Sequence, residues 1–443
     1  SYGNAVGEAH YPGEIITSEQ IEDLTSPDDG KIHIYATWGL LDNYLTALKD
    51  ARFVDGNVYT NVIKITQNDG ASISSAHGDF TLRGNNLFIW GADTLNGNVI
   101  IDGMAIQNQG LSATNSNHGD GNSFGIFANG HTLVIGTGVD VTDGVRNSKN
   151  SWAAPQIYGG SNNGSCGSTN VIIHSGTFYN VVAGGYECTI NGDTNLVVRG
   201  GTILDTIIGG NAGGSSSSYN VITGNTNVHI SGDASMPGDE YEEKQLDQNY
   251  NSGFNLTEST ILTGGSNNGT VKGNTYVHIS GDAKLWDVQG GGRRGSSVVG
   301  EYSGGSINGN LISGGTAHVY VSGKAVIKHV LCGSITDGIY SDNGNQCVKN
   351  VEMHISDSAA VASVFGAGYD TWFDPGYSSM YNGGDISISI DGGATVGYVY
   401  GGGYRGTVGL GSQHINNTST THPLDSISIS VSGNATVLGD VFG

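Results

Sequence analysis

One short phrase recurs along this chain at irregular intervals, and the recurrence limits the folds that the chain can adopt. Residues 227–234 read NVHISGDA and residues 276–283 read YVHISGDA. Weaker copies precede and follow them, with equivalent turn positions at 176, 201, 232, 281, 323, 357, 392 and 433. The shortest interval runs from 176 to 201, and the longest, from 232 to 281, is almost twice as long. A constant motif at variable spacing indicates one structural unit that carries insertions.

Within each copy, apolar and polar residues alternate, which is the pattern of a β-strand with one buried face. Val277 and Ile279 are apolar, whereas His278 and Ser280 are polar. An alanine follows the turn in every late copy, and a second apolar pair and two or three glycines come after it. We predict that the alanines align in one narrow interior column, and that the later glycines supply positive φ at the next corner. The alanines are Ala234, Ala283, Ala325, Ala359, Ala394 and Ala435.

Short strands joined by glycine corners are compatible with a sandwich, a propeller or a solenoid. A propeller blade needs about four strands and a nearly constant period of roughly 40 to 50 residues. The interval from 176 to 201 is too short for such a blade, and a sandwich gives no reason to repeat one turn eight times. The spacing therefore predicts an all-β fold, a right-handed parallel β-helix solenoid of about ten coils over residues 61–443.

Residues 1–60 differ from the repeats. Thr17 and Gln20 form a capping-box pattern, and residues 40–51 carry apolar side chains at helical spacing. We expect residues 1–60 to form a small helical cap, because an uncovered first coil would expose open strand edges. Residues 441–443 stop within a glycine corner, and we expect the chain to be a fragment, monomeric by itself, of a longer protein.

The composition restricts the partners. Of 443 residues, 74 are glycine and 6 are proline, and the 40 acidic residues outnumber the 17 basic ones to give a formal charge of −23. A nucleic-acid partner is disfavoured because phosphate contacts require clustered lysine and arginine. No apolar run approaches the roughly 20 residues of a membrane-spanning helix, so we expect no membrane insertion.

The four cysteines are Cys166, Cys188, Cys332 and Cys347, and their spacings match no C-x-x-C metal or redox motif. Cys166 and Cys188 are about one coil apart, which predicts a disulfide between neighbouring coils or at the base of a loop. A disulfide between Cys332 and Cys347 would close the segment between them. Free buried thiols are the alternative. An even number of cysteines favours export, so we expect an extracellular protein that is secreted or attached to the cell wall.

Insertions that mostly follow the glycine corner should emerge along one edge of the solenoid, where a rigid repeat scaffold usually carries its function. One insertion, residues 237–258, has clustered carboxylates that suit calcium, although no D-x-D-x-D-G spacing occurs and a solvated acidic loop is the alternative. Its acids are Asp239, Glu240, Glu242, Glu243 and Asp247.

Two histidines recur at one outward strand position. His229 and His278 are equivalent in successive copies, and Tyr320 and His354 follow at the same position. Stacked imidazoles suit a transition metal, but outward polar residues on a strand face are the better explanation of the pattern. We therefore expect neither a metal nor another cofactor.

Residues 368–384 are the expected ligand-binding site, because five aromatic and two acidic residues lie within 13 positions. Aromatic faces stack on sugar rings while carboxylates accept hydrogen bonds from sugar hydroxyls, and protein-binding hot spots use the same residue types. A loop folded over its own small core is the alternative. The expected ligand-binding residues are Tyr369, Asp370, Trp372, Phe373, Asp374, Tyr377 and Tyr381, with Tyr404 in the next corner.

Catalytic patterns are sparse. The chain has no His-Glu-x-x-His or P-loop motif. Asp102, Asp120 and Asp143 have the residue type of a glycosidase acid pair, but their spacing does not require them to converge. We therefore expect no enzymatic activity.

The repeats at 227–234 and 275–283 and the stretch FANGHTLVIG at 127–136 resemble those of large bacterial cell-surface, adhesin-like β-helix proteins of the pectin-lyase-like superfamily. The resemblance covers about residues 60–443 and carries over no catalytic residues. It implies a surface-displayed rod that binds host or environmental glycans or glycoproteins through loops on one edge. A polysaccharide-active enzyme (a glycoside hydrolase or lyase) on the same scaffold and a passive surface spacer are the alternatives.

Overall fold

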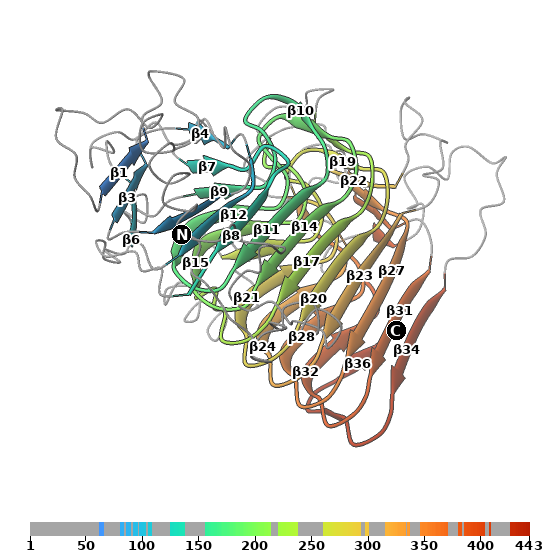
Figure 1. Cartoon of the computed structure of the whole chain (residues 1–443). Coiled ribbons are helices and arrows are strands. Elements are labelled where there is room, and N and C mark those ends of the chain that lie inside the picture. Colours follow the sequence, from blue (N-terminus) through green and yellow to red (C-terminus); the bar gives the residue numbers. More distant parts are fainter. Residues whose placement is uncertain are drawn as a thin grey trace, which may run out of the picture.

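The chain forms a parallel β-helix in which each coil stacks on the preceding one, as the computed structural model shows (Figure 1). The predicted N-terminal helical cap, residues 1–60, lies outside the residues that the structure describes. These are residues 62–65, 80–83, 86–89, 92–95, 97–102, 105–108, 125–137, 156–213, 220–237, 260–293, 297–300, 315–333, 335–336, 346–370, 380–382, 385–403, 407–408 and 426–443.

Three long parallel sheets run along the solenoid, and from residue 164 onward successive coils add one strand to each. The 11-stranded sheet contains β2 (Phe80–Arg83), β5 (Val99–Asp102), β8 (Thr132–Ile135), β11 (Thr169–Ile173), β14 (Thr194–Val198), β17 (Thr226–Ile230), β20 (Thr275–Ile279), β23 (Thr316–Val321), β27 (Asn350–Ile355), β31 (Ile386–Ile390) and β34 (Ile427–Val431). The 12-stranded sheet contains β4 (Ala92–Thr94), β7 (Gly125–Phe127), β9 (Gln156–Tyr158), β12 (Thr177–Val182), β15 (Thr202–Ile208), β18 (Ile261–Thr263), β21 (Lys284–Gln289), β24 (Val326–Leu331), β28 (Ala360–Phe365), β32 (Thr395–Tyr400), β35 (Thr436–Val437) and β36 (Val441–Phe442).

The third long sheet has eight strands, and two small sheets complete the described structure. The 8-stranded sheet contains β10 (Gly164–Cys166), β13 (Cys188–Ile190), β16 (Val221–Ile222), β19 (Thr270–Val271), β22 (Val298–Val299), β26 (Gln346–Val348), β30 (Met380–Asn382) and β33 (Thr407–Val408). The small sheets are β1 (Val62–Ile65), β3 (Asn86–Ile89) and β6 (Ala105–Asn108), and β25 (Ile335–Thr336) with β29 (Tyr369–Asp370).

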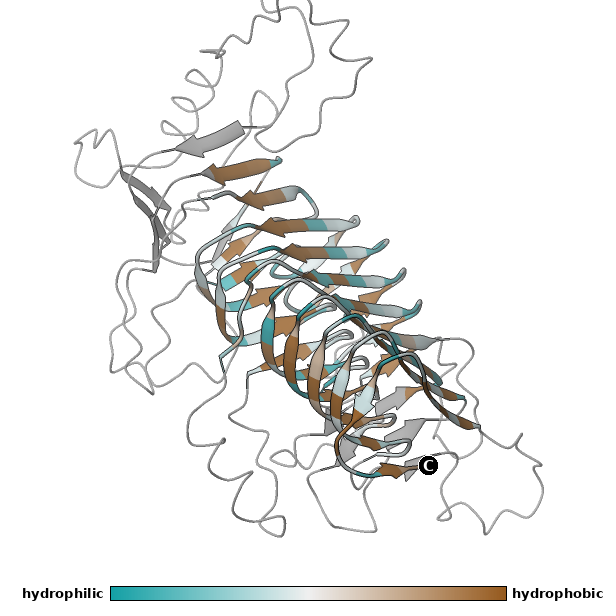
Figure 2. Ribbon diagram, turned by 90° about the horizontal axis from the view of Figure 1, so that it is seen from below, coloured by the Kyte–Doolittle hydropathy of each residue, from teal (hydrophilic) through white to brown (hydrophobic). Residues whose placement is uncertain are grey.

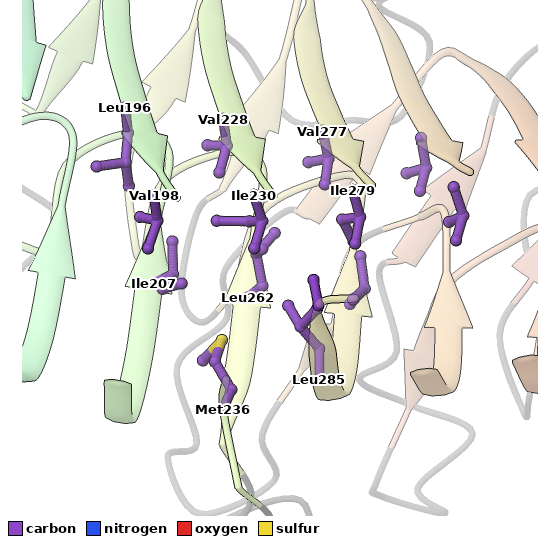
Figure 3. Packing of buried hydrophobic residues seen from close by; sticks show 14 of the residues in the cluster. Leu196, Val198, Ile207, Val228, Ile230, Met236, Leu262, Val277, Ile279 and Leu285 are labelled. Carbon is purple, nitrogen blue, oxygen red and sulfur yellow. The ribbon is translucent and has the colours of Figure 1, made fainter. Parts of the chain in front are cut away.

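Equivalent residues of successive repeats lie directly opposite one another. Val228 is opposite Val277, and Val277 is opposite Val319. Their side chains point into the solenoid, where Val277 and Ile279 are almost fully buried; Figure 3 shows this continuous apolar interior. Figure 2 shows apolar residues concentrated in the strands and hydrophilic ones at the turns. The alternation of apolar and polar residues in the sequence therefore predicts correctly which side chains of a strand face the interior and which face outward.

The predicted alanine column is confirmed. The carbonyl oxygen of Ala283 accepts a hydrogen bond from the amide of Val326 at 2.9 Å, and that of Ala325 accepts one from Ala360 at 2.9 Å, so the alanines stack coil upon coil. Ala234, Ala283, Ala325, Ala359 and Ala394 are buried. A small side chain fits here because the wall bends sharply after the turn and leaves little interior space.

Buried threonines tie four successive coils to their own glycine corners. The hydroxyl of Thr226, at the start of β17, donates to the carbonyl oxygen of Gly264 at 2.6 Å, and that of Thr275, at the start of β20, donates to Gly290 at 2.6 Å. Thr169 and Thr194 make the equivalent bonds in the two preceding coils. The corner carbonyls therefore find partners inside the solenoid, as buried polar groups require.

The prediction that the glycines after the second strand supply positive φ is wrong. Positive φ occurs instead in the turn before the alanine, with values of 63° at Gly232 and 69° at Gly281. Gly264 and Gly290 are needed because another chain segment passes very close. A Cβ on Gly264 would lie 2.5 Å from the carbonyl oxygen of Gly290. Coil packing, and not backbone twist, requires glycine at this corner.

Candidate functional site

The outward face of the 11-stranded sheet carries two parallel rows of polar and aromatic side chains. The sheet register places the residues of each row directly opposite one another on successive strands. The predicted outward position shared by His229, His278, Tyr320 and His354 is confirmed as part of the first row. The first row is His229, His278, Tyr320, His354, Ser389 and Ser430, and the second is Asn195, Asn227, Tyr276, His318, Glu352, Ser387 and Ser428.

Five rings in these rows form stacks along the solenoid axis; we call them the ring ladder (His229, His278, Tyr320, Tyr276 and His318). In the first row the ring centroids of His229 and His278 are 4.6 Å apart, and those of His278 and Tyr320 are 4.7 Å apart. In the second row Tyr276 and His318 are 4.5 Å apart, with an interplanar angle of 2°. These separations match the spacing of about 4.8 Å between neighbouring strands, so the backbone itself sets the stacking.

Carboxylates hold the C-terminal end of the ring ladder in place. The Tyr320 hydroxyl donates to Oε1 of Glu352 at 3.3 Å, and Nδ1 of His318 lies 3.1 Å from Oε2 of the same carboxylate. Beyond the ladder, Nε2 of His354 lies 2.9 Å from Oδ2 of Asp391. The first contact joins the two rows, because Glu352 and His318 belong to the second row and Tyr320 to the first.

The three histidines and Tyr320 of the ring ladder are uncharged at neutral pH. Partial burial lowers the pKa values of His229, His278 and His318, and the neighbouring imidazoles lower that of His278 further. Glu352 partly opposes this effect at His318. Burial, with the charge of Glu352, raises the pKa of Tyr320 to about 12. Neither row contains lysine or arginine, so a ligand would meet hydrogen-bond donors and acceptors with one carboxylate at the C-terminal end of the ladder.

Sequence reasoning found the first row and missed the second. Tyr276, His318 and Glu352 each lie two residues before a first-row residue, at the other outward position of the same strand. The alternation that predicts Val277 and Ile279 to face inward also predicts two outward positions on the same strand. The second row could therefore have been recognised from the sequence pattern. The contacts between the rows depend on the sheet register, which the sequence pattern does not specify.

The aromatic segment predicted to bind ligand is described only in part. Tyr369 and Asp370 form β29, which pairs with β25, and Tyr381 lies in β30 opposite Cys347 of β26. Trp372, Phe373, Asp374, Tyr377 and Tyr404 lie outside the described residues. The same holds for the acids expected as a possible calcium site, Asp239, Glu240, Glu242, Glu243 and Asp247.

The predicted disulfides are not formed in the structure, where Cys166, Cys188 and Cys332 are free thiols. Gly164 is opposite Cys188 in neighbouring strands, so Cys166 lies two residues beyond its expected partner. The strand spacing and rise then separate the two Cα atoms by about 8 Å, whereas disulfides usually join Cα atoms about 4.4–6.8 Å apart. Cys332 is buried in the main core, and the side chain of Cys347 lies outside the described part of the chain.

A buried acid and imidazole on the 12-stranded sheet are a second polar cluster that sequence reasoning did not single out. Asp287 of β21 is opposite His329 of β24, and Ser363 of β28 is opposite His329 on its other side. Asp287 has no exposed surface and His329 is 6% exposed. Burial, assisted by the charge of Lys328, lowers the pKa of His329 to about 3, so its imidazole is neutral. A ligand from solvent has no access to the carboxylate, and we assign the pair no binding role.

Two searches within the described residues bear on function. These residues contain no group of three or more histidine, cysteine, aspartate or glutamate side chains placed to hold a metal ion. They also contain no helix long and apolar enough to cross a bilayer. Comparisons of the chain with family models, with curated proteins and with solved structures gave no match. The chemistry of the outward face of the 11-stranded sheet is therefore the guide to function.

Proposed function

We propose that this chain is the rod-like binding module of an exported, adhesin-like bacterial surface protein and that it recognises neutral glycans, free or on glycoproteins. The observation that carries the proposal is the ring ladder, five rings in register on the outward face of a sheet whose other face is a continuous core. The resemblance of the repeats to those of bacterial surface β-helix proteins supports the location.

The chemistry of the ring ladder favours sugar hydroxyls. Stacking covers the ring faces, so the ring edges, with their imidazole nitrogens and phenol hydroxyls, are the parts that remain for a ligand. They repeat about every 4.8 Å along a straight line, and a sugar hydroxyl both donates to and accepts from such groups. Because the backbone orders the rings before binding, the entropic cost of ordering them on association is reduced.

Charge favours a neutral glycan over an acidic one. The chain has a formal charge of −23, and Glu352 is the one acidic side chain of the two rows. A uronic-acid or sulfated polymer would meet this carboxylate without a compensating lysine or arginine, and like-charge contacts reduce affinity. The ladder therefore suits hexose or N-acetylhexosamine polymers.

A glycan array at pH 7.5 tests the proposal, with Tyr320→Phe and His278→Ala as the informative variants. Tyr320→Phe keeps the stacked ring and removes its hydroxyl. We expect binding to neutral glycans and a loss of about tenfold or more in affinity for each variant, since central interface contacts have effects of this size. The matched control is Trp286→Ala, which removes an aromatic side chain from the 12-stranded sheet, where Lys328 Nζ lies 4.7 Å from the centre of its ring. Unchanged affinity in both ladder variants would exclude the ring ladder as the glycan-binding site.

A second assay separates the alternatives. Incubation with the glycans that bind, followed by measurement of reducing ends, should detect no release. Release would support the polysaccharide-active enzyme, whereas neither binding nor release would support the spacer. Trp372→Ala and Tyr377→Ala test the aromatic segment separately. If these variants lose affinity for the glycan while the ring ladder is unchanged, the binding site lies in the aromatic segment instead.

A further inference from the structure

Two cysteines that form no disulfide are nevertheless in contact across neighbouring coils. Cys166 ends β10, Cys188 begins β13, and the two strands are adjacent and parallel. Because Gly164 is opposite Cys188, the two cysteine side chains lie on the same face of the sheet as diagonal neighbours. Cys166 packs against the buried cluster that Cys188 forms with Ile190, Ile222 and Val271.

The two thiols differ in exposure and in acidity. Cys188 is fully buried, and its Sγ lies 3.4 Å from Oδ1 of Asn211; Cys166 is half-buried between exposed neighbours. The hydrogen bond from Cys188 lowers the pKa of Cys166. The same contact, with burial, raises the pKa of Cys188. A half-buried thiol that ionises more readily than a free cysteine thus lies beside a fully buried thiol that keeps its proton while Cys166 is ionised, as in pairs with one attacking and one resolving cysteine.

We propose that Cys166 and Cys188 are a redox-active dithiol that low-molecular-weight disulfides oxidise. The Cys166 thiolate attacks one sulfur of a disulfide such as oxidised glutathione, which forms a mixed disulfide at Cys166 and releases one glutathione thiolate. The mixed disulfide leaves no thiolate at Cys166 to raise the pKa of Cys188. Cys188 then gives its proton to the released glutathione thiolate, and its own thiolate attacks the Cys166 sulfur. The bond between Cys166 and Cys188 forms and a second glutathione thiolate leaves. The protein loses two electrons and two protons, and one glutathione disulfide becomes two thiols.

The strand that must move to close this bond is the more compliant one. The Cα separation of about 8 Å has to shorten to less than about 7 Å. Among the described strands, β10 is the edge strand of its sheet, and it has three residues. A Cβ added at Gly167, directly after it, would have no heavy atom within 4 Å. β13 is held between β10 and β16. A crosslink that draws the edge strand out of register is strained, and a strained disulfide is readily reduced again.

Closure would covalently join two successive coils near the start of the 8-stranded sheet. An oxidising exterior would favour the joined form and a reducing environment the open one. The pair is therefore a reversible staple, in contrast to the permanent structural disulfide expected from the spacing of the cysteines.

Mass spectrometry of the whole chain tests the proposal. Wild type, Cys166→Ser, Cys188→Ser and Cys188→Ala are incubated with oxidised glutathione at pH 8, quenched in acid, alkylated and digested. We expect a Cys166–Cys188 crosslinked peptide in wild type that dithiothreitol reverses, a glutathione adduct on Cys166 in both Cys188 variants, and unmodified Cys188 in Cys166→Ser. Cys332, which is fully buried, should stay reduced in every sample.

Three results overturn the proposal: a wild-type chain that stays reduced, a stable glutathione adduct on wild-type Cys166 with no crosslink, or modification of Cys188 in Cys166→Ser. Far-ultraviolet circular dichroism of each variant shows whether the fold is kept. The two Cys188 variants serve as mutual checks, since alanine and serine disturb the apolar cluster differently but remove the same resolving thiol.

Discussion

Replacement of Thr226 by valine tests whether the buried threonine hydroxyls hold each coil closed at its glycine corner. Thr226 is fully buried, and its hydroxyl donates to the carbonyl oxygen of Gly264 at 2.6 Å. Valine has nearly the volume of threonine but no hydroxyl. The substitution therefore leaves the packing almost unchanged and removes one donor from a carbonyl inside the solenoid.

The expected loss of stability is about 1–2 kcal/mol. A buried polar group that loses its partner costs about 1–3 kcal/mol, and the added methyl group recovers up to about 0.8 kcal/mol. Thr316→Val is the matched control, because Thr316 begins β23 at a half-exposed position and Ala317 takes the inward place. We expect a change within about 0.5 kcal/mol for the control, as for most surface substitutions.

Hydrogen exchange monitored by mass spectrometry or NMR is the suitable assay, because a solenoid opens locally and its unfolding need not be two-state. The amide of Gly265 donates to the carbonyl oxygen of Gly291 at 2.8 Å, so it reports opening of this corner. In Thr226→Val it should exchange about 5- to 30-fold faster, which corresponds to about 1–2 kcal/mol. If Thr226→Val and Thr316→Val exchange equally slowly there, the hydroxyls do not hold the corner.

Three further predictions concern the turn before the alanine, the ring ladder and the residue that precedes β17. Gly281→Ala should lose about 1–3 kcal/mol in urea unfolding, because φ is 69° there and the added Cβ would lie 2.7 Å from the backbone nitrogen of Gly232. Gly167→Ala, whose Cβ meets open space, should change by less than about 0.5 kcal/mol, and equal losses in the two variants would contradict this reasoning. Burial and its neighbours lower the pKa of His278 from 6.5, so the folded chain binds fewer protons than the unfolded chain and stability should fall as the pH drops below about 6.5. His278→Gln should reduce that fall between pH 7.5 and 5, and an unchanged slope would remove His278 as its source. The Asn225 side chain accepts an amide hydrogen of the next coil at 2.8 Å; Asn225→Ala should cost about 1 kcal/mol and lower the melting temperature, while Asn225→Asp keeps the acceptor and should not.

The wall of the solenoid could be predicted because burial imposes a strict period on the sequence. Val277 and Ile279 must both face inward on one strand, and an alanine must follow each turn where the interior is narrow. Both requirements act on residues close together in the chain. They therefore appear in every repeat and can be recognised without a structure.

Glycine positions could be predicted, but their physical reasons could not. Gly281 is required both by positive φ and by the Gly232 amide nitrogen of the preceding coil, whereas Gly264 is required by the close approach of a carbonyl oxygen of the next coil alone. The same residue type meets both needs, so sequence alone does not separate them. The two roles become distinguishable only when the coils are stacked.

Contacts between coils were the least predictable feature. The approach of Glu352 to His318 and Tyr320 depends on the sheet register. The offset between Cys166 and Cys188 likewise depends on register, whereas their separation along the chain reports only the length of a coil. The aromatic segment around Trp372 has no counterpart in other repeats, so the periodicity that constrains the wall does not constrain it.

Pairs of spin labels on the second row test the central claim most directly, namely that successive coils stack in register. Asn195, Glu352, Ser387 and Ser428 lie in this row, and the last three are four, five and six strands from Asn195. With the native cysteines replaced by alanine, cysteine pairs at 195 and each of these positions carry the labels. Double electron–electron resonance should give distances of about 19, 24 and 29 Å, at about 4.8 Å for each strand. Distances that do not increase by about one strand spacing per coil would contradict the stacked solenoid.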